Sequence, residues 1–180
     1  MKIIIGLGNP GDKYKYSRHN LGFLALDWLN KDALWKYNKK FDSLLLAHED
    51  KLFVKPQTYM NNSGLATAKI LHYYHLLAKN LTLFTKKNSD LSDILYVIHD
   101  DLDINIGETK ISVNSSSAGH RGVESIIKEI KTQNFTRFRV GIKSNNKPEK
   151  MPIANYVLQS LDDKELKHAK ESFLNNWKII

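Results

Sequence analysis

The sequence predicts a single α/β domain, in which a mixed, twisted β-sheet is flanked by helices and a further helix lies at the C-terminus. Strand-like apolar runs and amphipathic helical patterns alternate along the whole chain. Its 180 residues are long enough to bury one sizeable core, and no linker rich in Pro or Gly divides them. Residues 1–180 are therefore expected to form one domain.

The first half of the chain is expected to contain three strands and two helices. The expected elements, in order, are a strand over 3–7, a helix from about 20, a hairpin of 43–47 with 51–54 across the turn 49–50, and a helix from 61 or 62. Lys55-Pro56 ends the hairpin, and either Asn61 or Asn62 is expected to cap the second helix.

The second half begins with a polar stretch over 86–90 that predicts a loop. The elements expected after it are a buried strand over 94–98, a strand over 107–113, a helix around 123–130, an alternating strand over 135–142 and a charged C-terminal helix. That last helix is expected to open at Ser160, where Ser-x-x-Asp forms a capping signature.

Composition limits the function classes. The net charge of +8 and the pI of about 9.5 indicate a polyanionic partner such as nucleic acid. Because cysteine is absent, a disulfide framework and a thiolate nucleophile are both excluded. The N-terminus lacks the layout of a signal peptide, and no apolar run reaches membrane-spanning length. We therefore expect a cytoplasmic protein that has no membrane partner.

His19 is the most informative single residue. It lies in Ser17-Arg18-His19-Asn20, between a glycine-rich turn at the end of a strand and the start of a helix. The positive end of the helix dipole disfavours an imidazolium, so His19 is expected to stay neutral. A neutral imidazole can accept a proton near pH 7, as a general base must. A capping or surface histidine is the alternative interpretation.

Residues 99–103, His-Asp-Asp-Leu-Asp, follow an apolar strand, at the kind of strand end where sites gather in α/β sheets. Their acids and histidine offer ligands for a divalent metal, but neighbouring strand residues point to opposite faces. A carboxylate that orients a distant imidazole is the simpler role, and capping of a turn is the bland alternative. His72 and His75 fit a half-exposed helix face better than a metal pair, so no metal is expected.

Three glycine-containing segments have ordinary structural explanations beside functional ones. Gly6-x-Gly8-x-x-Gly11 matches a dinucleotide-binding fingerprint, but no helix follows at once, so a nucleotide cofactor is not expected. The segment 55–64 offers amides, an aromatic ring and a thioether at a loop-to-helix junction, and those amides can bind a backbone or a ribose. The loop 114–122 precedes a helix whose free N–H groups suit an anion.

Four strings in this order and at these spacings resemble bacterial peptidyl-tRNA hydrolase: GLGNPGDKYKYSRHNLGF, KPQTYMNNSG, HDDLD and GHRG. The resemblance runs from Ile3 to about Ile142. It implies hydrolysis of the ester that joins a peptide to the terminal ribose of tRNA, which recycles tRNA from stalled translation. It also implies a peptidyl-tRNA partner, no cofactor and a monomer.

The resemblance assigns His19 as the base, Asp100 as the carboxylate that orients it, and Asn9 as a third catalytic residue. The positions that it implies for substrate binding are Tyr14, Tyr59, Met60, Asn61 and Arg121. Arg121 departs from the family, which has asparagine in a Gly-His-Asn-Gly motif. The preceding Asn-Ser-Ser-Ser-Ala also stands where the family usually runs to glycine.

Water activated by His19 is the simplest nucleophile, because the chain has no cysteine and no Gly-x-Ser-x-Gly elbow. Arg137 and Arg139 fall on one face of their strand and are expected to contact tRNA phosphates, unless one of them pairs with a carboxylate. Two alternatives remain: a non-catalytic RNA-binding protein of the same fold, and a metal-dependent phosphoesterase that uses the acids of 99–103.

Overall fold

The three consecutive isoleucines near the N-terminus form the centre of the sheet. In the computed structural model, which describes residues 1–77, 90–144 and 151–178, they lie fully buried in strand β1 (Lys2–Gly6). β1 pairs in parallel with β4 (Lys51–Pro56) on one side and with β5 (Leu91–Asn105) on the other. An unbroken apolar run is typical of a parallel strand that is covered on both faces.

The sheet is mixed, as the sequence predicts, with seven strands in the order β2-β3-β4-β1-β5-β7-β6. Strand β7 (Phe135–Lys143) continues the parallel part beside β5. The outer strands β2 (Lys36–Asn38), β3 (Ser43–His48) and β6 (Thr109–Val113) pair antiparallel with their neighbours.

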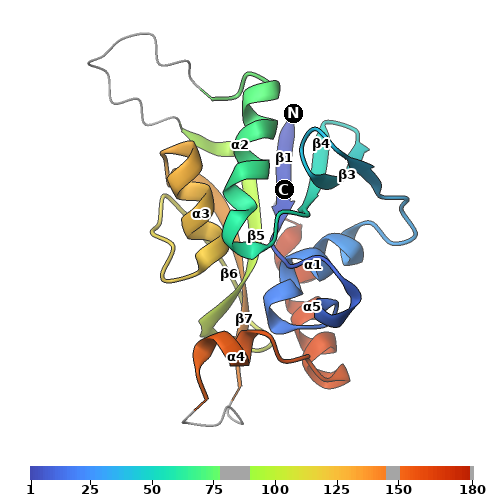
Figure 1. The fold of residues 1–180 in the computed structure, drawn as a ribbon. Helices are drawn as coiled ribbons and strands as arrows, with labels where there is room; N and C mark the ends of the chain where they lie inside the picture. Colours follow the sequence, from blue (N-terminus) through green and yellow to red (C-terminus); the bar gives the residue numbers. More distant parts are fainter. Residues whose placement is uncertain (78–89, 145–150, 179–180) are drawn as a thin grey trace.

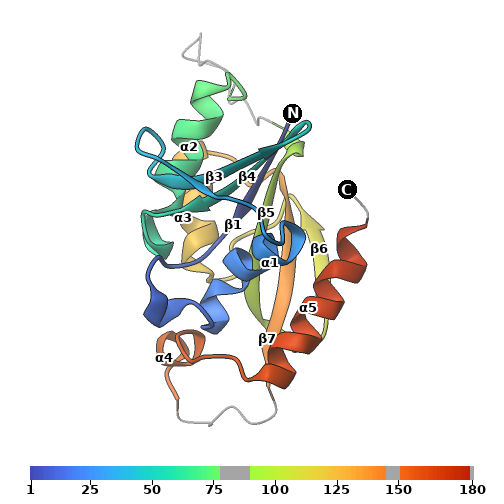
Figure 2. The ribbon, with the colours of Figure 1, turned by 90° about the vertical axis from the view of Figure 1, so that its right-hand side faces the viewer.

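Helices cover both faces of the sheet (Figure 2). Helices α2 (Ser63–Tyr73) and α3 (Arg121–Ile130) pack on one face, and α1 (Leu21–Leu29) and α5 (Asp163–Trp177) lie on the other. Each face has its own apolar core, because alternate residues of the strands point in opposite directions.

The chain leaves neighbouring strands toward opposite faces, since α1 follows β1 while α2 follows β4. Ligand sites in open α/β sheets lie at the carboxyl ends of strands where such a reversal occurs. Short helical segments gather at this end of the sheet (Figure 1). Three of them are single-turn 3-10 helices, η1 (Asp12–Tyr14), η2 (Arg18–Asn20) and η3 (Met60–Asn62), and the fourth is the five-residue α-helix α4 (Ile153–Val157).

Two glycines let α1 lie directly on the strands. A Cβ on Gly22 would lie 2.3 Å from the amide nitrogen of Leu7 and 2.4 Å from the carbonyl oxygen of Ile98. A Cβ on Gly6 would lie 2.3 Å from the carbonyl oxygen of Gly22. Helix and sheet therefore meet backbone to backbone, which brings η2 against the strand ends.

The elements differ from the sequence-based expectations in several places. β5 runs on through residues 99–105, and neither β2 nor α4 was expected. Asn62 is the N-cap residue of α2, one of the two asparagines expected there, but its side chain makes no capping hydrogen bond. Residues 86–89 of the expected loop lie outside the described residues. No described helix is long and apolar enough to cross a membrane.

The start of α5 also differs from the expectation. A capping box of Asp162 and Glu165 opens this helix, in place of the expected Ser160 signature. Both pairs have the spacing of a capping box. The carbonyl oxygen of Ser160 accepts a hydrogen bond from Arg18 Nη1, which ties this segment to η2.

Candidate active site

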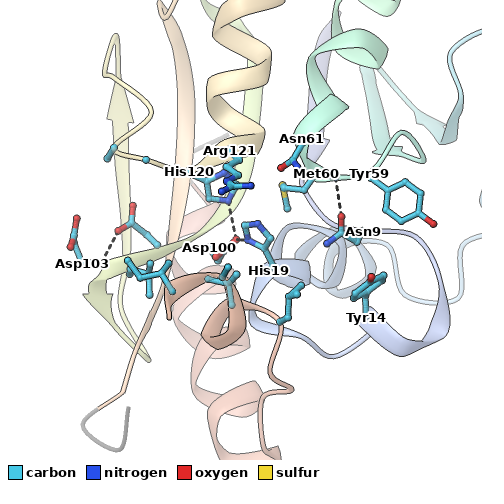
Figure 3. Close-up of a pocket in the computed structure, with 18 residues that line it drawn as sticks. Asn9, Tyr14, His19, Tyr59, Met60, Asn61, Asp100, Asp103, His120 and Arg121 are labelled. Atoms are coloured by element: carbon cyan, nitrogen blue, oxygen red, sulfur yellow. Dashed lines mark hydrogen bonds and ion pairs between the residues drawn. The ribbon is translucent and has the colours of Figure 1, made fainter. Parts of the chain in front are cut away.

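A pocket of about 530 Å³ opens at the carboxyl ends of the central strands (Figure 3). Eight residues predicted from the sequence line it: Asn9, Tyr14, His19, Tyr59, Met60, Asn61, Asp100 and Arg121. They come from four segments that lie far apart along the chain. The topology thus brings the separate sequence motifs into one cavity.

His19 and Asp100 form the expected pair. His19 Nδ1 lies 2.8 Å from Asp100 Oδ1, and the Asp100 side chain is only 2% exposed. A carboxylate oxygen can only accept, so we infer that Nδ1–H is the donor. This leaves His19 Nε2, on the other side of the ring, as the atom that can take a proton.

His120 is a third member of the cluster that the sequence did not single out. Its Nε2 lies 3.0 Å from the same Asp100 oxygen, and its Nδ1 lies 3.3 Å from the amide nitrogen of Val123. The Val123 N–H donates to Nδ1, so Nε2 carries the proton that Asp100 accepts. The signal in the sequence was its position just before a predicted helix, because His19 also lies close to the start of a helix.

The charges in this cluster reverse one expectation. Burial raises the pKa of Asp100, but the imidazoles of His19 and His120 lower it far more, so Asp100 stays ionised. Burial lowers the pKa of His19, yet the charge and the hydrogen bond of Asp100 raise it above its usual value. The expectation from the helix dipole alone is therefore wrong in direction, because a carboxylate in contact outweighs a partial charge at a helix end.

Asn9 is held in a fixed orientation. Its Oδ1 accepts a hydrogen bond from the amide of Met60 at 2.9 Å, and its Nδ2 group has no partner in the described part of the chain and can donate to a substrate. The backbone N–H and C=O of Asn9 both bond to the side-chain amide of Asn20, each at 2.9 Å. These contacts present a preorganised N–H donor at the pocket (Figure 3).

Tyr59 and Tyr14 lie on the same side of the pocket (Figure 3). Tyr59 has φ +59° and ψ 160°, a backbone conformation that costs a non-glycine residue on the order of 1–3 kcal/mol, and the residue is 56% exposed. Strained residues of this kind concentrate at functional sites. Part of the pocket wall comes from α4 and the residue after it, and its members are Ile153, Ala154, Val157 and Leu158.

Arg121 lies at the start of α3 beside His120 (Figure 3). It is exposed, and its charge lowers the pKa of His19, which opposes the effect of Asp100. In the part of the chain that the structure describes, no carboxylate pairs with its guanidinium. Arg121 therefore contributes an unneutralised positive charge to the pocket.

The two strand arginines behave differently from each other. Arg137 is only 2% exposed, and its Nε and Nη1 atoms have no partner among the described residues. A guanidinium buried to that extent has no surface to offer to a phosphate, so the expected contact is corrected for Arg137. Arg139 Nε donates to Asp101 Oδ2 at 2.8 Å, which agrees with the alternative that one of the two arginines pairs with a carboxylate.

His19, Asp100 and His120 also place three ligand atoms within 4.8 Å of one another, close enough to surround a metal ion. The hydrogen bond to His120 Nδ1 argues against that use, because a neutral imidazole that binds metal through Nε2 must carry its proton on Nδ1. The Val123 N–H points at that position. The residues therefore fit a hydrogen-bonded cluster better than a metal centre.

The histidine pair and the glycine fingerprint do not have the geometry of a metal site or a dinucleotide site. His75 lies beyond the end of α2 in a left-handed conformation, so it does not share a helix face with His72. The glycine fingerprint is followed by η1 and η2, and the first α-helix starts only at Leu21. The first helix is therefore too far along the chain for the dinucleotide-binding geometry.

The parallel strands, the pocket at their carboxyl ends and the imidazole held by a buried carboxylate together define an α/β enzyme with a histidine-based hydrolytic centre. Among known families, the model described as "Peptidyl-tRNA hydrolase" matches residues 3–179. The chain belongs to the peptidyl-tRNA hydrolase family.

Individual relatives agree with this assignment. Proteins named peptidyl-tRNA hydrolase from Mycoplasma capricolum and Mycoplasma mycoides are 43% and 40% identical to this chain, over all of it and 91% of their own length. A crystal structure of peptidyl-tRNA hydrolase from Acinetobacter baumannii is 26% identical and matches with a TM-score of 0.78. That match covers 96% of this chain and 83% of the other. The resemblance stated from the sequence motifs, including the α/β fold with its C-terminal helix, is confirmed.

Proposed function

We propose that this protein hydrolyses the ester bond between an N-blocked peptide and the terminal ribose of tRNA, with His19 as general base and Asp100 as its orienting carboxylate. The observation that carries the proposal is the 2.8 Å contact between these two side chains inside an open pocket. Membership of the peptidyl-tRNA hydrolase family supports the substrate. A net charge of +8 suits a tRNA partner.

In the proposed reaction a water molecule attacks the ester carbonyl carbon while His19 Nε2 takes its proton. The negative charge that develops on the carbonyl oxygen receives hydrogen bonds from Asn9 Nδ2 and the Asn61 amide. When the bond to the ribose oxygen breaks, the His19 imidazolium returns the proton to that oxygen. The products are the free peptide acid and tRNA with an intact 3′ end.

The remaining pocket residues are proposed as substrate contacts. The half-buried ring of Tyr14 and the exposed ring of Tyr59 offer flat apolar surfaces, and Met60 offers a flexible thioether. Arg139 keeps one side of its guanidinium beyond the Asp101 pair for a phosphate. We further propose a monomer that acts in the cytoplasm, where tRNA is used, and gel filtration with light scattering checks the monomer.

The direct test of the function is the release of free tRNA from N-acetyl-phenylalanyl-tRNA, with unblocked phenylalanyl-tRNA as the control substrate. We expect release from the blocked substrate only. A non-catalytic RNA-binding protein would bind the tRNA without releasing it. A phosphoesterase would instead shorten the RNA, which a sizing gel detects.

Arg121→Asn is expected to weaken tRNA binding and to reduce the slope of log K against log salt by roughly one phosphate contact. An amide donates and accepts, whereas a guanidinium only donates and carries a full charge, so Arg121 suits a phosphate better than a peptide backbone. Because the Arg121 charge lowers the pKa of His19, its removal is also expected to move the acid limb of the pH–rate profile to higher pH. Salt titrations of binding and pH–rate profiles measure the two effects.

The matched control for this experiment is Lys128→Asn, which removes an exposed charge from the same helix away from the pocket. It is expected to leave the salt slope nearly as it is. If Arg121→Asn keeps the wild-type slope and instead changes the preference between blocked and free aminoacyl-tRNA, Arg121 serves the peptide and the assignment is wrong.

Activity is expected to persist after exhaustive chelation, because the proton on His120 Nε2 disfavours a metal in the cluster. The assay is run in EDTA with spermidine, which keeps the tRNA folded without divalent ions. The phosphoesterase interpretation would be favoured if hydrolysis is lost in EDTA and restored by a divalent ion, while a thermal melting curve shows that the tRNA stays folded.

A further inference from the structure

Hydrogen bonds hold both neighbours of His19 in place, Arg18 before it and Asn20 after it. Arg18 is a charged side chain, yet the residue is only 7% exposed. Its contacts lie in the C-terminal part of the chain, near the junction between α4 and α5. The proposed reaction uses neither Arg18 nor these partners, so their role is open.

A carboxylate, a carbonyl oxygen and an aromatic ring hold the guanidinium of Arg18, while its buried Nε has no hydrogen-bond partner among the described residues. Its Nη2 donates to both carboxylate oxygens of Glu165, at 2.7 and 2.9 Å, and its Nη1 donates to the carbonyl oxygen of Ser160 at 2.9 Å. Its planar group lies 4.6 Å from the centre of the Tyr156 ring. The Arg18 backbone N–H also donates to the carbonyl oxygen of Gln159 at 2.9 Å. Contacts of this kind fix a guanidinium in one orientation.

Glu165 has a second task at the start of α5. Its Oε2 accepts a hydrogen bond from the Asp162 amide at 3.1 Å, and the Glu165 amide donates to Asp162 Oδ1 at 2.8 Å. The carboxylate that begins α5 therefore also holds the neighbour of the catalytic base. The α4 wall of the pocket lies just before this junction, so one contact links that wall, α5 and η2.

We propose that the Arg18–Glu165 pair is a positioning device that sets where the His19 imidazole lies relative to Asp100 and the α4 wall. The proposal rests on the proposed role of His19 as the base. Arg18 and Glu165 touch no reacting atom and act through the η2 backbone. Misplacement of a catalytic group by about 1 Å can cost roughly 10²-fold in rate, so a partial loss of this contact has a measurable effect.

Glu165→Gln separates positioning from helix capping. Glutamine is accepted at this place in a capping box, so the start of α5 is kept. Its neutral amide cannot accept both hydrogen bonds from Arg18 Nη2, because its NH₂ group only donates. We expect kcat to fall roughly tenfold, with KM within about twofold of wild type. The matched control is Asp162→Ala, which removes the cap but leaves the Arg18 pair, and which is expected to lower Tm without lowering kcat.

A double-mutant cycle tests whether the two residues act through one contact. Arg18→Lys keeps the charge and loses the planar fork, so it is expected to lower kcat to a similar extent. The double variant is expected to lose no more than the worse single variant, because the contact can be broken only once. The proposal is overturned if Glu165→Gln has wild-type kcat, or if Glu165→Gln and Asp162→Ala lose kcat in proportion to their loss of Tm.

The NMR titration of the His19 ring in the free enzyme gives a readout that does not depend on the reaction. Among the described residues, the charged or titratable groups that face this ring are Asp100, His120 and Arg121. If Glu165→Gln moves the ring away from Asp100, its titration midpoint falls. If the wild-type protein shows no hydrolase activity but Glu165→Gln still shifts the His19 titration, the proposed function is wrong and the positioning role stands. Wild-type hydrolysis, with neither kcat nor the titration altered in Glu165→Gln, removes the positioning role alone.

Discussion

Alanine in place of His19 is expected to lower the turnover of N-acetyl-phenylalanyl-tRNA at least about 10²-fold, the usual scale for a positioned general base. The neighbouring imidazole cannot take over, because His120 Nδ1 already accepts from Val123 and its Nε2 donates to Asp100. Affinity for tRNA is expected to stay within about threefold of wild type, since the change removes one side chain that is mostly buried. Single-turnover rates and filter binding measure the two quantities separately.

His72→Ala is the matched control for His19→Ala, because it removes an exposed imidazole that lies away from the pocket. It is expected to keep wild-type turnover. A folded His19→Ala protein with near-normal turnover would show that the base is another group.

Asp100→Asn is expected to lower turnover by about 10²-fold or more and to leave tRNA affinity nearly unchanged. The buried carboxylate holds both His19 and His120 through one oxygen, and a neutral amide cannot supply the same charge. Because the base must be neutral, the wild-type rate is lost as pH falls through the pKa of His19, which Asp100 raises. In Asp100→Asn this acid limb is expected to move to lower pH, and a pH–rate profile checks the direction.

Asp103→Asn is the control for this second prediction, since Asp103 is an exposed neighbour in the same acidic segment. The proposed mechanism gives it no proton-transfer role, so most activity is expected to remain. A chain that needs Asp103 but tolerates Asp100→Asn would fit metal ligation by the acidic segment instead.

Much of the fold could be predicted because local pattern and tertiary environment agree. The isoleucine run of β1 is buried on both faces, and the alternation in β7 places Phe138, Val140 and Ile142 in one of the two cores. His19, Asp100 and the segment 55–64 were found because a strand-like run or a helical pattern ends or begins beside each of them in the sequence, whereas Asn9 and Tyr14 came from the resemblance to a known family. Strand ends converge in this topology, so motifs distant in sequence meet in one cavity.

What the sequence did not predict depends on partners far along the chain. The burial of Arg137 follows from the elements that cover its strand, and nothing in its own alternating strand pattern indicates this. The raised pKa of His19 depends on a carboxylate 81 residues away. The short helix α4 has too few residues to show a period of its own, although its side chains line the pocket.

The contact of Gly22 with the backbone of β1 and β5 has a consequence for how this enzyme can change over time or by design. A side chain of any size at Gly22 would overlap main-chain atoms, which cannot turn aside as a side chain can. Helix α1, which follows the base, can therefore pack on the sheet in only one position. Substitutions at Gly22 cannot shift this helix by small steps. Substitutions that change substrate preference are easier to accommodate at α4, where the apolar side chains of the pocket wall can be replaced one at a time.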